Sequence, residues 1–275
     1  MHLLRRVYKK ILLEGHALTH RRFPKVLANS MPKAGTNLLI RLLELFGQRR
    51  MGHLDIGPYE AILRLSPDHS KRAAAFLSGI RPGFFASAHF YYSDEIASLI
   101  DRCSIKTITI VRDPRDVCVS DAYYIMKNNR HRLHPFYATM SAEERLMASI
   151  TGMSCNRLEG DPPSLDIGTH YRRFSGWLSF RENLTIRFED LIGTAGGGSR
   201  QAQGKAVSQV ADYLGLRLSP EAVSAVCKNL FWTGSKTFRE GRIESWKNHF
   251  NDDHVAAFSR IIGNGLEVFG YDEPV

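Results

Sequence analysis

The sequence predicts a single α/β domain over residues 1–275, in which a mostly parallel central sheet is flanked by helices on both faces. Short runs rich in β-branched residues alternate with segments of helical periodicity, as in parallel strands joined by crossover helices. The length of 275 residues and the hydrophobic content of 43% suffice for one large core. The pattern predicts strands near 26–31, 84–88, 105–111 and 184–188, and helices near 37–47, 93–101, 114–126, 141–150, 203–214 and 219–229.

The first predicted strand leads into a turn that suits an anion. Residues 31–37, Met-Pro-Lys-Ala-Gly-Thr-Asn, precede a helix, and the N–H groups and positive end of a helix start favour phosphate. Gly35 lets phosphate oxygens approach the backbone, while Lys33 adds a charge and Thr36 a hydroxyl. The lysine precedes the glycine, unlike in nucleotide-triphosphate P-loops. For this segment alone, an ordinary strand-to-helix turn with a solvated lysine is the alternative.

The strand predicted at 84–88 places His89 at its carboxyl end. Ligands of open α/β sheets bind at this edge, so His89 is expected beside the turn at 31–37. Histidine titrates near neutral pH and is the natural general base for a hydroxyl. A structural histidine is the alternative.

The β-branched strand at 105–111 brings Arg112 to the same edge. Asp113 suits the cap of the next helix and Pro114 its first turn. Ser120 lies two turns into that helix on a face it can share with Arg112, and a guanidinium and a hydroxyl together suit one phosphate. A structural salt bridge is the alternative. Combined with the first turn, this segment indicates a ligand that carries phosphate at two separate places.

Four separated segments resemble the cytosolic-type sulfotransferases, which use 3′-phosphoadenosine 5′-phosphosulfate (PAPS) as donor and release 3′-phosphoadenosine 5′-phosphate (PAP). The resemblance spans roughly residues 26–250. The four segments are residues 32–36, Pro-Lys-Ala-Gly-Thr; residues 112–120, from Arg112 to Ser120; residues 188–191, Phe-Glu-Asp-Leu; and residues 238–250, from Phe-Arg-Glu-Gly to Trp-Lys-Asn-His-Phe.

The resemblance implies a P-loop-like three-layer sandwich that transfers a sulfuryl group from PAPS to a hydroxyl of a small alcohol, phenol or saccharide, without a metal. His89 matches the family's catalytic base, and Lys33 is implied to stabilise the leaving oxygen. The residues implied to bind the donor are Lys33, Ala34, Gly35, Thr36 and Asn37 at the 5′-phosphosulfate, Phe188 at the adenine, and Arg112, Ser120, Arg239, Glu240 and Gly241 around the 3′-phosphate.

Four positions depart from the family pattern. Leu38 replaces a tryptophan that packs on adenine, and Phe188 replaces a tyrosine. Ser87 replaces a second lysine near the reacting oxygen, and Ser245 replaces an aspartate. None of these changes removes a phosphate contact, so they predict a more apolar adenine pocket and leave the acceptor side open.

Three further features of the sequence carry weaker predictions. Trp177, at the end of a fifth and weaker match over residues 168–177, is expected in the core. The glycine-rich residues 193–199 predict a flexible connection, because no lysine or arginine follows in register. The reserve candidates for the base are His53, His170 and Glu60, the last because some carbohydrate-sulfating relatives use a carboxylate.

Charge and cysteine content narrow the protein class. The net charge of +9, from 37 basic and 28 acidic residues, suits solubility and an anionic donor. The basic residues are dispersed and no nucleic-acid reader motif is present, so nucleic-acid binding is not expected. The four cysteines show neither metal-ligand spacing nor pairing, which indicates a reducing, cytoplasmic compartment.

Two segments lie outside the expected sheet. Residues 1–24 form a basic amphipathic segment, of which residues 1–13 could lie on an anionic membrane surface or pack on the domain itself. Residues 128–170 are expected to form a lid or wall of the acceptor site. Two alternatives remain for the whole chain: a P-loop-type small-molecule kinase and a non-catalytic phosphate-ligand binding module. The acceptor and the oligomeric state are left open.

Overall fold

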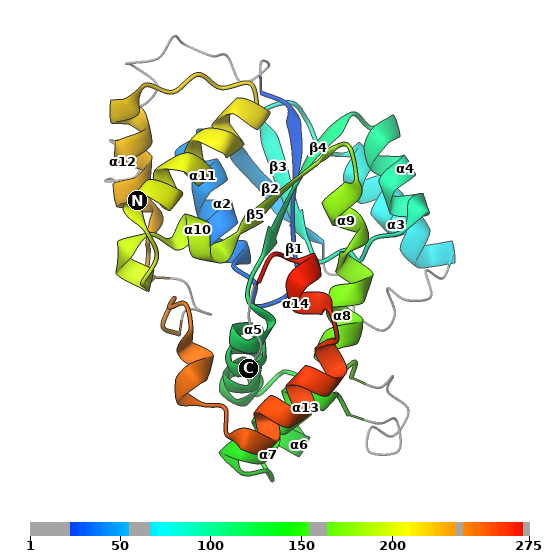
Figure 1. Cartoon of the computed structure of the whole chain (residues 1–275). Coiled ribbons are helices and arrows are strands. Elements are labelled where there is room, and N and C mark those ends of the chain that lie inside the picture. The colour runs from blue at the N-terminus through cyan, green and yellow to red at the C-terminus, as the bar shows by residue number, and fades with distance from the viewer. Residues whose placement is uncertain (1–22, 55–66, 154–163, 235–238, 272–275) are drawn as a thin grey trace.

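The computed structural model describes residues 23–54, 67–153, 164–234 and 239–271, which are built around a five-stranded sheet (Figure 1). Each strand pairs in parallel with its neighbours, in the order β2-β3-β1-β4-β5. The predicted α/β class with a parallel central sheet is therefore confirmed. The strands are β1 Lys25–Ser30, β2 Arg49–Leu54, β3 Phe84–Ala88, β4 Ile105–Val111 and β5 Asn183–Arg187.

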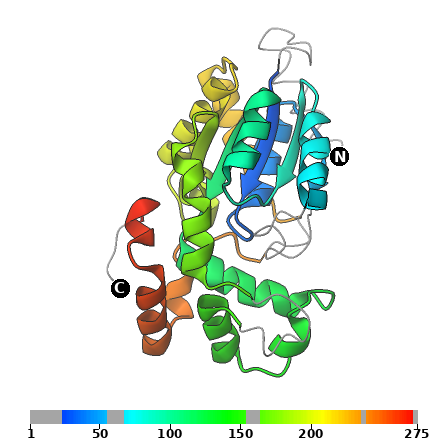
Figure 2. The same ribbon diagram turned by 90° about the vertical axis from the view of Figure 1, so that its right-hand side faces the viewer.

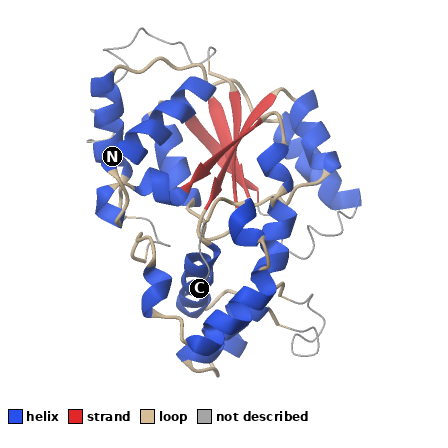
Figure 3. Cartoon of the chain, in the orientation of Figure 1, coloured by secondary structure: helices blue, strands red, loops and turns tan. Residues whose placement is uncertain are grey.

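Helices cover both faces of the sheet (Figure 3). Each face has its own apolar core, because the strands turn alternate side chains to opposite sides and the helices bury their apolar stripes there. Trp177 is fully buried in one of these cores, as predicted. One face carries α2 Thr36–Leu45, α10 Phe188–Ile192, α11 Arg200–Tyr213 and α12 Pro220–Leu230; the other carries α3 Pro67–Ser78, α4 Asp94–Arg102, α8 Ile167–Phe174 and α9 Gly176–Ser179.

A third group of helices lies beyond the carboxyl ends of the strands (Figure 2). In it α5 packs on α7, and α7 packs on α13. Part of this group comes from the predicted insertion at 128–170, whose residues 154–163 lie outside the described residues. The group comprises α5 Pro114–Lys127, α6 His134–Tyr137, α7 Ala142–Thr151 and α13 Asp252–Ile262, and α14 Gly265–Val268 follows it against α8.

The predicted strands and helices are all present, each within a few residues of its expected ends. The strand β2 was not predicted, because its sequence Arg-Arg-Met-Gly-His-Leu is polar and it forms the exposed edge of the sheet. The helices α3, α8 and α13 were also missed. The helix α3 begins with the polar run Pro-Asp-His-Ser-Lys-Arg, and α8 has only eight residues. The helix α13 has an apolar stripe, with Ala257, Phe258 and Ile262 buried, that could have indicated it.

The strand register brings the predicted site residues to one edge. Asn29 pairs with Ala88, and Ser30 pairs with Ile110, so the residues that follow β1, β3 and β4 emerge side by side. The same edge faces α5 across the space below the sheet (Figure 1). The site is therefore built between the strand ends and the first turns of α5.

Candidate active site

The turn between β1 and α2 has the backbone of an anion-binding loop. Gly35 has φ +112° and Lys33 has φ 64°, so both lie in the left-handed region. Gly35 directly precedes α2, whose first N–H groups have no acceptor within the helix. The hydroxyls of Ser30 and Thr36 are 2.6 Å apart, which closes the turn. Ala34 is fully buried beneath it, while Asn37 points outward from the first helical turn.

Gly35 also has no room for a side chain. An added Cβ would lie 2.7 Å from Cδ2 of Phe188 and 3.0 Å from Cδ1 of Ile110. We predict that Gly35→Ala lowers the free energy of unfolding by about 1–3 kcal/mol, through backbone strain and this clash, and weakens PAP binding. Urea unfolding and calorimetry measure the two effects.

Gly215→Ala is the matched control, since Gly215 also has a positive φ of +75° but nothing within 4 Å of an added Cβ. This variant should show strain alone and bind PAP normally. Equal stability losses and normal PAP binding for both variants would contradict a special role of Gly35.

His89 is held in a defined tautomer at the end of β3. Its Nδ1 lies 2.7 Å from the carbonyl oxygen of Ser30 and 3.2 Å from the Ser30 hydroxyl. A carbonyl oxygen only accepts, so Nδ1 carries the proton, and the lone pair of the neutral ring is on Nε2. Because Ser30 also contacts Thr36, the histidine and the anion-binding turn are joined through one residue.

Lys33 lies against α5. Its Nζ is 3.9 Å from the ring centroid of Tyr124. Burial lowers the pKa of Lys33 to about 8; the carboxylate of Asp121 opposes this shift, and nearby cations reinforce it. Near neutral pH the side chain is therefore mostly an ammonium, able to stabilise a developing negative charge.

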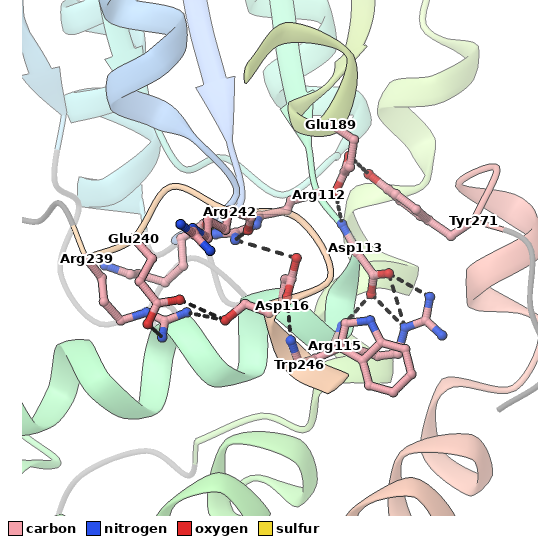
Figure 4. Close-up of polar contacts among 12 residues, drawn as sticks. Arg112, Asp113, Arg115, Asp116, Glu189, Arg239, Glu240, Arg242, Trp246 and Tyr271 are labelled. Carbon is pink, nitrogen blue, oxygen red and sulfur yellow. Dashed lines mark hydrogen bonds and ion pairs between the residues drawn. The ribbon is translucent and has the colours of Figure 1, made fainter. Parts of the chain in front are cut away.

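Arg112 lies at the centre of the second half of the site (Figure 4). The residue is 5% exposed, and its guanidinium donates to the carbonyl oxygens of Lys33, at 3.3 Å, and Arg242, at 2.7 Å. Its Cζ lies 4.4 Å from the centroid of the Phe188 ring, and Asp116 is an ion-pair partner at 3.6 Å. The Nε of Arg112 is buried without a hydrogen-bond partner.

The first turn of α5 is fixed as the sequence predicted. Asp113 caps the helix by accepting from the N–H of Arg115 at 2.8 Å, and Pro114 begins it. Asp116 accepts from the N–H of Trp246 at 2.9 Å, so α5 is tied to the C-terminal segment (Figure 4). Ser120 lies further along α5 and is half-buried.

Arg239 pairs with Glu240 (Figure 4), and both side chains also contact the hydroxyl of Ser245. Arg239 donates to Glu240 Oε1 at 2.8 Å and to the Ser245 hydroxyl at 3.1 Å, and that hydroxyl donates to Glu240 Oε2 at 3.0 Å. Ser245 thus orients Arg239 although the family's aspartate is missing. A carboxylate repels phosphate, so the side chain of Glu240 fits a role in orienting Arg239 better than direct contact with the donor.

The glycine-rich residues 193–199 are more closely packed than the predicted flexible connection. Gly196 is buried in the short 3₁₀ helix Thr194–Gly196, and its carbonyl accepts from the N–H of Ile243 at 3.0 Å. An added Cβ on Gly196 would lie 2.4 Å from the carbonyl oxygen of Gly241. These glycines therefore pack against the segment that carries Arg239. The glycine-rich composition alone did not reveal this contact.

The reserve base candidates differ in position. The His53 ring lies 4.9 Å from the ring of His89, and its Nδ1 is 3.1 Å from the hydroxyl of Ser87. His170 shares a hydrogen bond with the hydroxyl of Tyr91, and burial lowers its pKa to about 4. Glu60 lies outside the described residues.

Several neighbours of the site were missed from the sequence. Arg50 on β2 donates to the Ser87 hydroxyl at 3.4 Å, so a guanidinium approaches the position where the family has a second lysine. Tyr124 is four residues after Ser120, and this helical spacing could have indicated that both face the site. Arg50 gave no signal, because its strand was not recognised.

The described residues contain neither a membrane-spanning helix nor a metal-binding cluster. No helix in them is long and apolar enough to cross a membrane. Within the same residues, no group of three or more His, Cys, Asp or Glu side chains could hold a metal ion.

Solved structures with this fold are sulfotransferases and a related enzyme. Mouse sulfotransferase SULT7A1 complexed with PAP superposes with a TM-score of 0.60 and 17% identity, covering 95% of this chain and 90% of that one. Retinol dehydratase in complex with androsterone and the inactive cofactor PAP gives 0.55 and 13%, covering 95% and 86%. At these identities the similarity establishes the fold.

The sequence comparisons establish the family. Sulfotransferase 2A6 of Mus musculus is 22% identical over 269 residues, which cover 86% of this chain and 82% of that protein. The 3-alpha-hydroxysteroid sulfotransferase of Cavia porcellus is 26% identical over 179 residues, which cover 57% and 54%. The family model of the sulfotransferase domain matches residues 23–270, so the chain belongs to the sulfotransferase domain family. The predicted PAPS-dependent sulfotransferase is thereby confirmed as a class.

Proposed function

We propose that this sulfotransferase uses His89 as general base and Lys33 as the cation at the leaving group, with PAPS held between the β1–α2 turn and α5. The observation that carries the proposal is the hydrogen bond from His89 Nδ1 to the Ser30 carbonyl. It leaves the ring's lone pair on Nε2 next to a turn built for phosphate. The chain acts in this proposal as one domain.

The donor has two anionic ends, and the site offers two groups of donors. The N–H groups of Gly35, Thr36 and Asn37 would hold the 5′-phosphosulfate. The N–H of Ala34 donates to the carbonyl of Met31 at 3.2 Å and so shapes the turn. Arg112, Ser120, Arg239 and the backbone at Gly241 would hold the 3′-phosphate, with Glu240 orienting Arg239. Phe188 lies between Gly35 and Arg112, where it would contact the adenosine.

The transfer needs few chemical groups. The acceptor oxygen attacks sulfur in line while His89 Nε2 takes its proton, and the bond between sulfur and the phosphate oxygen breaks. The electron pair of that bond remains on the phosphate, where the ammonium of Lys33 stabilises the new charge. Positioning and electrostatic stabilisation supply most of the rate, as in phosphoryl transfer.

The acceptor in this proposal is a small molecule or saccharide that presents a hydroxyl near His89. The helices α6 and α7, from the described part of residues 128–170, would form its outer wall. Contact of residues 1–13 with a membrane surface stays a prediction, since these residues lie outside the described ones. A cytoplasmic location stays a prediction too.

Calorimetry with PAP and mass spectrometry of product from labelled PAPS and an acceptor panel test the proposal together. We expect PAP to bind without a metal ion and label to appear on a hydroxyl acceptor. Tight binding of ATP only with Mg²⁺ would favour a P-loop-type kinase. PAP binding without turnover on any acceptor, and no effect of His89→Ala, would favour a non-catalytic binding module.

A further inference from the structure

Asp121 follows Ser120 on α5 and takes no part in the donor site described above. We infer that Asp121 is the counter-ion of Lys33, a positioning residue that keeps the lysine charged and held against α5 before the donor binds. The inference rests on the proposed role of Lys33 and assigns to Asp121 a function in preparing the site for PAPS.

The geometry directs Lys33 toward Asp121. The Nζ of Lys33 lies 3.9 Å from the centroid of the Tyr124 ring, which places the ammonium against α5. Tyr124 is three residues after Asp121 on α5, so the two share a helix face. The carboxylate of Asp121 therefore lies on the surface that the ammonium approaches.

Most charged groups around Lys33 are cations, so an anion is needed to keep its ammonium form favourable. Its other charged neighbours are cations: Arg112 directly after β4, Lys127 at the end of α5, and Arg239 in the C-terminal segment. His131, from the loop after α5, also faces Lys33, but burial lowers the pKa of His131 to about 4, so its ring is neutral near pH 7. Asp121 is the anion that acts on Lys33, and Lys33 is the cation that acts on Asp121.

The remaining groups around Asp121 are uncharged near neutral pH. Cys118 lies one turn earlier on α5, and Tyr137 approaches from α6. The pKa of each is raised, chiefly by burial and further by the carboxylate, so both stay protonated. No other cation in the described residues competes with Lys33 for Asp121.

These neighbours determine in which direction the charge of Asp121 shifts the pKa of Lys33. Burial raises the pKa of Asp121 to about 6, and burial lowers that of Lys33 to about 8, so both groups are charged between these values. Neutralising Asp121 removes the influence that raises the pKa of Lys33. The lysine then loses its proton at lower pH and can no longer stabilise the leaving oxygen.

Three variants measure this effect in the donor-free protein. Asp121→Asn keeps the shape and removes the charge, Asp121→Glu keeps the charge, and Lys127→Met removes an exposed cation from the same neighbourhood. Competitive labelling with acetic anhydride, read by mass spectrometry across pH, gives the pKa of Lys33 in each. We expect it to fall by about one unit in Asp121→Asn, to stay near the unsubstituted value in Asp121→Glu, and to rise in Lys127→Met.

The alkaline limb of kcat/KM for PAPS should move in the same directions, because this parameter reports groups of the free enzyme. An unchanged or raised pKa of Lys33 in Asp121→Asn would overturn the inference. An equal fall in Asp121→Glu would overturn it too, since charge would then not be the cause. Failure of the proposed function appears differently: Lys33 would titrate as expected while PAPS is neither bound nor consumed.

Discussion

Replacing His89 by alanine is expected to lower turnover by about 10²–10⁴-fold, the usual contribution of a general base. PAP affinity should stay nearly unchanged, because His89 meets the turn through Ser30 and is not itself part of the turn. Product formation from labelled PAPS and calorimetry with PAP measure the two quantities.

His53→Ala is the control, since His53 lies beside His89 and is the reserve base. It should reduce turnover far less than His89→Ala. Full activity of His89→Ala would refute the assignment, and a complete loss in His53→Ala alone would transfer the base role to that residue.

Removal of Arg112 or Ser120 is expected to weaken PAP much more than adenosine 5′-phosphate. A hydrogen bond to a charged group contributes about 1.5–3 kcal/mol, so Arg112→Ala should weaken PAP by roughly 10–150-fold relative to the monophosphate. The adenosine monophosphate serves as internal control, because it lacks the 3′-phosphate.

Ser120→Ala separates recognition from folding in this experiment. Arg112 also donates to the carbonyls of Lys33 and Arg242, so its loss can disturb the site as a whole. Ser120→Ala breaks none of these contacts to the carbonyls of Lys33 and Arg242, so thermal unfolding of this variant should show an intact fold. Equal losses for both nucleotides would mean that these residues do not read the 3′-phosphate.

The sequence was sufficient to place the main site residues at one edge of the sheet. The apolar strands β1, β3 and β4 are recognisable, and parallel strands put their carboxyl ends together, so Lys33, His89 and Arg112 could be expected as neighbours. Family resemblance added the nucleotide and the reaction. The strand ends and the family motifs can both be recognised from short stretches of sequence, without knowledge of the tertiary contacts.

The remainder depends on contacts between distant segments. Arg50 reaches Ser87 only because a polar edge strand pairs with β3, and no periodicity marks that strand. In the sequence Glu240 cannot be told from an ordinary acidic surface residue, because its contact with Arg239 is visible only in the structure. Residues 193–199 have the composition of a linker, yet their small size is what lets the chain at Gly241 approach. Such roles are set by tertiary packing.

The group that selects the tautomer of His89 belongs to the main chain of Ser30. Every amino acid retains that carbonyl, so no substitution at position 30 deletes the acceptor of the Nδ1 proton. The hydroxyl of the same residue, which contacts Thr36, is lost in most substitutions. Substitutions at position 30 can therefore weaken the contact that closes the β1–α2 turn while the tautomer of His89 is preserved, so two properties that meet at one residue can vary separately.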